Sequence, residues 1–193
     1  MTSAIVTGLD GIVLGLARNP ATGYEIKRAF DSIFSHIWAA ELSQIYRTLK
    51  RLEDEACLKS RAEPSDRGPE RRKYEITARG RKRLHAWLAG GPQVGDERHA
   101  HVAQLFFLGE LRDFTVTEAF LETLLGTYRH RVAALGAMET SWRSADPHYP
   151  DRLDPEAFHS ALTLQMGLQR TEALARWAEE ALKRVRKRRA QEK

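Results

Sequence analysis

The sequence lacks the features that mark secreted, membrane-spanning and cysteine-rich proteins. Its 193 residues include one cysteine, Cys57, which excludes an internal disulfide and a cysteine-rich metal site. Apolar runs stay short of the roughly 18 residues that a membrane span needs, and residues 1–20 lack the basic segment and cleavage site of a signal peptide. We therefore expect a cytoplasmic protein without a membrane segment, in which Cys57 is a small, buried apolar residue.

The motifs of common enzymes are also missing. The chain has no glycine-rich phosphate loop, no Gly-x-Ser-x-Gly and no paired carboxylates with a partner histidine. Asp96, Glu97, His99 and His101 are close in sequence, but the remaining ligands of a metal site are missing at any recognised spacing. We therefore expect no enzyme activity, no cofactor and no metal, and we interpret this cluster as an exposed helix start.

The net charge of +5 is unevenly distributed along the chain. Residues 1–90 carry a net charge of +5, residues 91–182 carry −6, and residues 183–193 carry +6. A basic first half indicates contact with a polyanion, for which nucleic acid is the obvious candidate.

Hydrophobic spacing predicts three helices before residue 56. Apolar residues recur every three or four positions in 5–16, 26–37 and 42–52. Thr22 and Glu25 have the spacing of a capping box, which is typical of a helix start. The apolar side of the third helix consists of Leu42, Ile45, Leu49 and Leu52.

The opposite side of the third helix mixes hydroxyl, amide and basic groups. At about 100° per residue it comprises Ser43, Arg47, Lys50 and Arg51, with Gln44 and Tyr46 at its margins. Such a face on the third of three packed helices is typical of a recognition helix in the DNA major groove. An ordinary solvated face has a similar composition, so this pattern alone favours solvent exposure.

A basic β-hairpin is predicted directly after the third helix. Residues 58–63 and 71–76 alternate in polarity, and a loop with proline and glycine separates them. The cations around its Gly-Pro pair, at the tip, are Arg67, Arg71, Arg72 and Lys73. Thr77 then has the position of an N-cap for a fourth helix over residues 78–89. This order of elements predicts a winged helix-turn-helix whose hairpin, the wing, contacts phosphate. The alternative is a charged loop that aids solubility.

Three consecutive segments are specific enough to compare with known proteins: TGYEIKRAF, WAAELSQIYRTLKRLEDEACL and GPERRKYEITARGRKRL. In this order and at these intervals, the first ninety residues resemble the PadR-like family of winged-helix transcriptional regulators. The resemblance implies a homodimer, usually a repressor, that binds an inverted-repeat operator in double-stranded DNA. It also implies that a small aromatic effector often releases the DNA.

The match to the family's motifs implies which residues contact DNA. It indicates Gln44, Tyr46 and Arg47 in the third helix and the basic residues at the start of the second wing strand. With the other residues of the same two surfaces, the predicted DNA-binding set is Ser43, Gln44, Tyr46, Arg47, Lys50, Arg67, Arg71, Arg72 and Lys73. The chain departs from the family at Glu41, where a serine is usual, and at Ala56, where a glycine is usual.

Beyond residue 90 the chain is predicted to be helical. Glycine and proline mark a linker at 91–98 between a DNA-binding domain at 1–90 and a helical dimerisation domain, with a possible effector site, at 99–193. Thr115 is expected to cap a long helix. In that helix, residues with coiled-coil spacing are Leu121, Tyr128, Leu135 and Trp142. The sequence thus predicts a mainly α fold with a small β-hairpin.

The last predicted helix carries two apolar stripes. One consists of Phe158, Leu162, Leu174, Trp177 and Ala181. The other consists of Leu164, Leu168, Ala175, Ala178, Leu182 and Val185. One chain covers only one stripe easily, so the second predicts a partner helix from an identical chain. The alternative is a monomeric bundle in which both stripes are internal.

Large aromatic and sulfur-containing side chains of this domain are candidates for an effector site. The family resemblance implies that such groups stack on planar ligands near the dimer centre, and the candidates are Tyr128, Trp142, Met166 and Trp177. Plain core or dimer packing is the alternative. For the whole protein, the alternative function is a helical protein-binding or RNA-binding module without operator specificity. The basic face lacks the stacking aromatics with which proteins bind single-stranded RNA.

Overall fold

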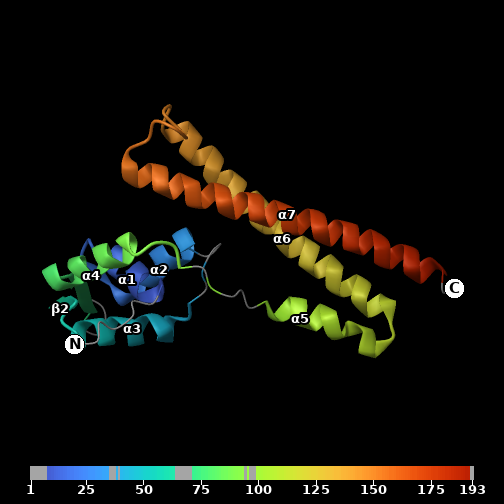
Figure 1. The fold of residues 1–193 in the computed structure, drawn as a ribbon, viewed down its shortest axis with the longest axis horizontal. Helices are drawn as coiled ribbons and strands as arrows, with labels where there is room; N and C mark the ends of the chain where they lie inside the picture. The colour runs from blue at the N-terminus through green and yellow to red at the C-terminus, as the bar shows by residue number, and fades with distance from the viewer. Residues whose placement is uncertain are drawn as a thin grey trace. The chain divides into compact units, whose positions relative to one another are not determined.

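The structure, a computed structural model, describes residues 8–34, 38, 40–63, 71–93, 95 and 99–191. Contacts divide the chain into two compact units, Met1–Asp96 and Glu97–Lys193 (Figure 1). In the described ranges, the first unit contains four helices and a small antiparallel sheet, and the second is helical. The predicted fold class, mainly α with a small β element, is confirmed.

The helices of the first unit share one apolar core. They are α1 (Gly8–Leu16), α2 (Gly23–Phe34), α3 (Leu42–Asp54) and α4 (Ala78–Ala89). Val13, Phe30 and Leu84 are buried in this core together with the inner stripe of α3. That stripe is Ile45, Thr48, Leu49 and Leu52. The expectation that Leu42 belongs to it is wrong, because the buried stripe begins one turn later and Leu42, in the first turn, is exposed.

Two helix starts follow the predicted capping patterns. The Thr22 N–H donates to Glu25 Oε2 at 2.7 Å, and the Glu25 N–H donates to Thr22 Oγ1 at 3.2 Å. The hydrogen bond from the Thr22 backbone is the main reason why the pKa of Glu25 is lowered. Thr77 Oγ1 accepts from the Gly80 N–H at 3.1 Å and caps α4. Both caps are confirmed.

The sheet has one strand more than predicted. β2 (Leu58–Glu63) and β3 (Arg71–Ile76) form the expected hairpin, and the loop with Arg67 lies outside the described residues. A short strand, β1 (Ala21–Thr22), pairs with the other edge of β3, which gives the order β1-β3-β2. Two residues are too few to show the alternation that predicts a strand, so the sequence did not indicate β1.

The turn between α3 and β2 requires a left-handed residue. Ala56 has a φ of 55°. Its N–H donates to the Glu53 carbonyl at 2.8 Å, and the Cys57 N–H donates to the Leu52 carbonyl at 2.8 Å. These two bonds satisfy the last carbonyls of α3, in a motif whose left-handed position usually holds glycine. The glycine expected from the family therefore has a conformational reason here, and Ala56 adopts the same turn at a steric cost.

The second unit is built on two long helices. Its elements are α5 (Ala100–Phe107), the 3-10 helix η1 (Leu108–Leu111), α6 (Phe114–Ala145) and α7 (Pro155–Gln191). The predicted cap at Thr115 is wrong. α6 begins at Phe114, so Thr115 lies inside the helix, and Asp113 caps it by accepting the Thr115 N–H at 2.7 Å.

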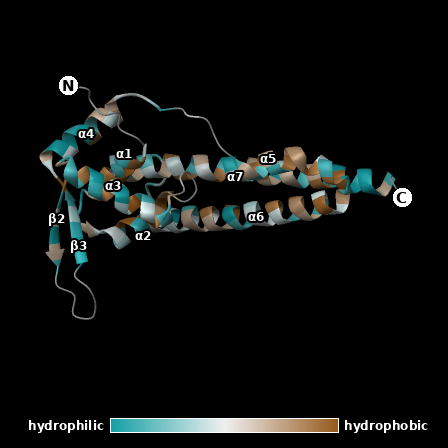
Figure 2. Cartoon of the chain, turned by 90° about the horizontal axis from the view of Figure 1, so that it is seen from below, coloured by the Kyte–Doolittle hydropathy of each residue, from teal (hydrophilic) through white to brown (hydrophobic). Residues whose placement is uncertain are grey.

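α6 and α7 lie side by side and bury one stripe of α7 (Figure 1). Leu164, Ala178 and Leu182 are buried, and the latter two pack with Leu121, Leu125 and Tyr128 of α6. On the other stripe, Leu162 and Trp177 are exposed by 47% and 41%. Leu174 and Ala181 of that stripe are partly buried against the same cluster. Figure 2 shows hydrophobic positions interspersed with hydrophilic ones along both helices. Within this chain, α6 therefore covers one predicted stripe and part of the other.

Ion pairs join the start of α6 to the end of α7. Arg186 donates to Glu118 at 2.8 Å and to Glu122 at 2.5 Å, and Arg189 also pairs with Glu118. Two cations of the basic C-terminal segment are therefore matched by acidic groups of the preceding helix. Among the described helices, none combines the length and the apolar composition needed to cross a membrane.

Candidate nucleic-acid interface

The outer face of α3 carries the predicted polar and basic residues. Ser43, Gln44, Tyr46, Arg47 and Lys50 are all exposed, while the inner stripe fixes α3 on the core. Arg47 Nε donates to the Ser43 carbonyl at 3.3 Å, which holds the start of its side chain along the helix. The face thus offers an amide, a phenol, a hydroxyl and two cations to one partner surface.

Arg51 does not belong to this face. Helical periodicity predicts that it lies beside Lys50, but its guanidinium turns to Asp10 of α1 and to Glu55. The expectation was wrong because a buried carboxylate attracts a guanidinium at the margin of a helix face more strongly than solvent does.

Tyr46 is positioned by a glycine of α2. A Cβ on Gly23 would lie 2.4 Å from Cε1 of the Tyr46 ring, so the ring rests directly on the α2 backbone. Tyr46 nevertheless keeps 44% of its surface exposed. The glycine of the TGYE segment therefore provides the space that sets the position of this aromatic group on the outer face.

Gln44 has a structural role that was not predicted from the sequence. Its Oε1 accepts the Glu41 N–H at 2.9 Å and so caps the start of α3. The signal was present as Glu-x-x-Gln, a variant of the capping box with glutamate in place of serine or threonine.

The outer face of the wing is positively charged. Because side chains alternate along strands, the face opposite Tyr74 and Ile76 consists of Lys59, Arg61, Glu63, Arg71, Lys73 and Glu75. Two of its cations are paired within the sheet, Lys59 with Glu75 at 3.1 Å and Lys73 with Glu63 at 2.9 Å. Lys73 is therefore less available to a partner than we expected.

Among the wing cations that the structure describes, Arg61 and Arg71 are the most available. Both are exposed, and neither has an ion pair within the part of the chain that the structure describes. Arg61 was not in the predicted set, although the alternation of residues 58–63 and the hairpin register would have indicated it, since it lies opposite Lys73.

The wing is attached to the end of α3 through Glu53. This carboxylate accepts a hydrogen bond from Ser60 of β2 and lies 3.7 Å from Arg72 of β3. Arg72, on the inner-facing side of its strand, still has an exposed guanidinium. The contacts of Glu53 therefore fix the wing beside the polar face of α3.

The four predicted effector residues do not form one cluster within a chain. Tyr128 is buried and its hydroxyl lies 3.0 Å from Nε2 of His101. Trp142 lies fourteen residues further along α6, about 21 Å away at the helical rise. Met166 and Trp177 are exposed on α7, about 16 Å apart by the same measure.

The structure gives no support for a metal site. Among the residues it describes, no three histidine, cysteine or carboxylate side chains could share an ion. The rings of His99 and His101 lie 5.3 Å apart, while Asp96 and Glu97 are outside the described part of the chain.

Three helices on a common core, a hairpin attached to the third and an exposed polar face define the class of the first unit, a winged helix-turn-helix. Residues 12–86 match the transcriptional regulator PadR-like family, and residues 97–186 match the virulence activator alpha C-terminal family. The first unit is therefore similar to PadR-like transcriptional regulators over residues 12–86, and the second unit matches a different family model.

Relatives match over almost their full length. The chain is 27% identical over 192 residues to a probable transcriptional regulator of Mycobacterium tuberculosis, with 92% of this chain and 97% of the relative covered. It is 27% identical over 172 residues to the negative transcriptional regulator PadR of Bacillus subtilis, with coverage of 88% and 93%.

Solved structures share the fold. Bacillus subtilis PadR in complex with operator DNA superposes with a TM-score of 0.73 at 24% identity, over 93% of this chain and 99% of that one. The same protein in complex with p-coumaric acid gives a TM-score of 0.67 at 23% identity, over 92% and 98%.

Proposed function

We propose that the protein is a dimeric repressor that binds an inverted-repeat operator in double-stranded DNA and is released by a small aromatic effector. The observation that carries the proposal is the exposed polar and basic face of α3 beside the cationic outer face of the wing, in one compact unit. The relatives are bacterial regulators of transcription, so its place of action is the cytoplasm.

The two surfaces suit two kinds of DNA contact. An α-helix fits the major groove, where amide and guanidinium groups bind base edges, so α3 is assigned to base recognition through Gln44 and Arg47. The wing has flexible cations and no amide on its outer face, which suits phosphate oxygens. In this proposal Arg61 and Arg71 contact the DNA backbone, while Lys73 chiefly stabilises the hairpin.

The exposed apolar residues of α7 support a homodimer. Leu162, Met166 and Trp177 are large, apolar and exposed on this helix. A second copy that covers them would remove apolar surface from water, and a two-fold pair of DNA-binding units would match two half-sites.

Bacillus subtilis PadR binds p-coumaric acid in a solved structure, which supports a planar aromatic acid as the class of effector. In this chain the candidate residues are too far apart for one small ligand to touch all of them from one protomer. Trp177 is the residue chosen for testing, because it is exposed and lies on the stripe assigned to the dimer.

DNA binding is tested with duplexes that the protein itself selects. A duplex enriched from a random-sequence library should be bound in gel shifts more tightly than its scrambled version, and p-coumaric acid or a related phenolic acid should release it. Single-stranded RNA of the same sequence should bind weakly. Equal binding to selected and scrambled duplexes would contradict an operator-specific function, and preference for the RNA would favour the RNA-binding alternative.

The effector site is tested by fluorescence. Titration with p-coumaric acid should quench tryptophan emission strongly in the wild type and less in Trp177→Ala, with Trp38→Phe, an equally exposed tryptophan of the first unit, as the control. Equal quenching in wild type and Trp177→Ala would place the ligand elsewhere.

A further inference from the structure

A ring of four charged side chains joins three helices of the first unit. Asp10 of α1 is 1% exposed, and each of its oxygens meets a different arginine. Oδ1 accepts from Arg51 of α3, and Oδ2 accepts from Arg83 of α4 at 3.3 Å. A buried carboxylate needs such partners, because an unpaired charge in an apolar core is strongly unfavourable.

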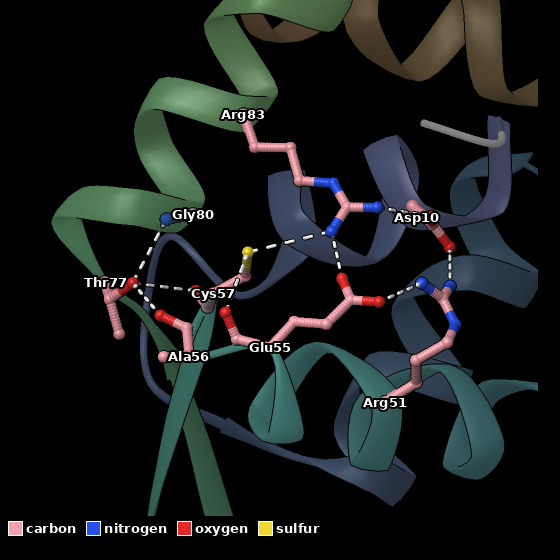
Figure 3. A network of polar contacts seen from close by, with 8 residues as sticks. All are labelled: Asp10, Arg51, Glu55, Ala56, Cys57, Thr77, Gly80 and Arg83. Carbon is pink, nitrogen blue, oxygen red and sulfur yellow. Dashed lines mark hydrogen bonds and ion pairs between the residues drawn. The ribbon is translucent and has the colours of Figure 1, made fainter. Parts of the chain in front are cut away.

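Glu55 closes the ring from the opposite side. It directly follows the last residue of α3, and Figure 3 shows its carboxylate between the two guanidinium groups. Oε1 accepts from Arg51 at 3.2 Å, and Oε2 accepts from Arg83. Burial works to raise the pKa of Glu55, but the hydrogen bonds and charges of Arg83 and Arg51 outweigh burial and lower it. Each charge of the ring therefore touches two of opposite sign.

The apolar core and the ring restrain α3 in different ways. Apolar packing is non-directional, so it holds α3 against the core without fixing its rotation sharply. Guanidinium–carboxylate contacts are directional and fix orientation. Arg51 follows Lys50 directly and lies one turn beyond Arg47, so the rotation that satisfies the ring also sets where these two side chains point.

We propose that Glu55 is a positioning residue for DNA recognition: by bridging Arg51 and Arg83 it locks the recognition helix to α4 in the rotation that presents Gln44, Arg47 and Lys50 to the major groove. This inference rests on the proposed function. It assigns no DNA contact to Glu55 itself, and it makes the orientation of α3 depend on α4, the last helix before the second unit.

The test compares two neighbouring carboxylates. Glu55→Gln removes the bridge, and Asp54→Asn removes the same charge from an exposed position one residue away. Both changes raise the net charge equally, so their sequence-independent effect on DNA binding should be similar. The measured quantity is the ratio of affinities for the enriched duplex and its scrambled version, at a temperature where every variant is folded.

The ratio should fall about fivefold or more in Glu55→Gln, comparable to the removal of one well-placed base interaction, and stay within about twofold of wild type in Asp54→Asn. A residue that serves stability alone would lower the folded fraction and weaken both duplexes equally, so the ratio would not move. The salt dependence of binding to the scrambled duplex should be the same in the two variants, because both keep every phosphate-binding cation.

Glu55→Asp provides a second variant that keeps the charge and shortens the reach by one methylene. Like Glu55→Gln, it should lower the ratio of the two affinities, because the shorter side chain cannot span both guanidinium groups. A ratio unchanged in both Glu55 variants would overturn the positioning role while leaving the proposed function intact. A wild-type protein without any preference for the enriched duplex would overturn both.

Discussion

At the scale of single residues, Gln44 combines a structural contact with a proposed functional one. Its Oε1 accepts the Glu41 N–H, so Nε2 is the group that remains to face DNA as a donor. A donor matches N7 and O6 of guanine, whereas the two-point contact with adenine also requires the amide oxygen. We therefore expect Gln44 to donate to N7 or O6 of guanine and not to form the two-point contact with adenine.

Replacing Gln44 in two ways separates capping from recognition. Gln44→Glu keeps an acceptor for the Glu41 N–H but removes the amide donor, so thermal unfolding should be almost unchanged while binding to the enriched duplex weakens by at least about 1–3 kcal/mol. Gln44→Ala should abolish both interactions and lower the free energy of unfolding by about 0.5–1 kcal/mol. Equal duplex binding by wild type and Gln44→Glu would contradict a base contact.

Ala56 offers a gain in stability. Its left-handed conformation costs about 1–2 kcal/mol for a residue with a Cβ, and glycine would remove this cost. Part of that gain is lost, because glycine also gives the unfolded chain more conformational freedom. Ala56→Gly should therefore raise the free energy of unfolding by about 0.5–1 kcal/mol in denaturant titrations. Ala62→Gly, in the extended strand β2, should lower it instead, and a loss at both positions would contradict the strain at Ala56.

At the scale of elements, the wing is expected to bind DNA without regard to sequence. Replacing Arg61 and Arg71 with alanine should weaken binding to enriched and scrambled duplexes alike. It should also flatten the log–log salt dependence by about one unit for each phosphate that the variant no longer neutralises. Replacing Arg131 and Arg152, two exposed arginines of the second unit, removes the same charge and should leave the slope unchanged. A wild-type slope in the wing variant would show that its cations are only solvated.

The helical unit should respond to pH through His101. Burial is the main cause of its lowered pKa, with smaller effects of His99 and Arg131. Because the pKa is lower in the folded than in the unfolded state, the contribution to stability is present above the ordinary value of 6.5. It is lost as pH falls from there through the folded pKa.

Thermal unfolding between pH 7 and 5 checks this expectation. The unfolding temperature of the wild type should decrease as the pH is lowered, and His101→Gln should make this decrease smaller. His130→Gln, on the exposed side of α6, is the control and should keep the wild-type slope. Identical slopes in wild type and His101→Gln would show that the histidine contributes nothing.

Elements with local signals were predictable from the sequence. Two helix starts are indicated by capping residues that bond three positions along the chain, Thr22 with Glu25 and Thr77 with Gly80. The wing strands are indicated by alternating polarity over six residues each. The cap at Asp113 was misplaced because Thr115 lies two residues away and is an equally common capping type.

Contacts between residues far apart in the chain could not be predicted from the sequence. Asp10 and Arg83 are 73 positions apart, and neither has a neighbour in sequence that indicates the pairing. The same holds for Arg51, whose helical position is at the margin of the outer face and whose direction is decided by Asp10. The outer faces of the candidate site were thus predictable by periodicity, whereas the contacts that orient them were not.

At the scale of the whole molecule, dimerisation has to be tested without breaking the second unit. Truncation near Gln169 would remove Ala178 and Leu182, which pack on α6, and would unfold the unit itself. A charged residue on the exposed stripe is a cleaner change.

Leu162→Glu should produce monomers in sedimentation experiments and weaken binding to the enriched duplex, because the carboxylate would lose its hydration in a dimer interface. Thr163→Glu, also exposed on α7, is the matched control and should remain dimeric. A Leu162→Glu protein that still sediments as a dimer would place the interface elsewhere.

The ring of Asp10, Arg51, Glu55 and Arg83 also bears on heat tolerance. Hydration of charged groups becomes less favourable as temperature rises, so the cost of burying Asp10 among its partly exposed partners declines on warming. The orientation of α3 should thus be retained up to the melting of its unit. On gradual heating, discrimination between DNA sequences would end abruptly together with the fold, instead of fading at lower temperatures.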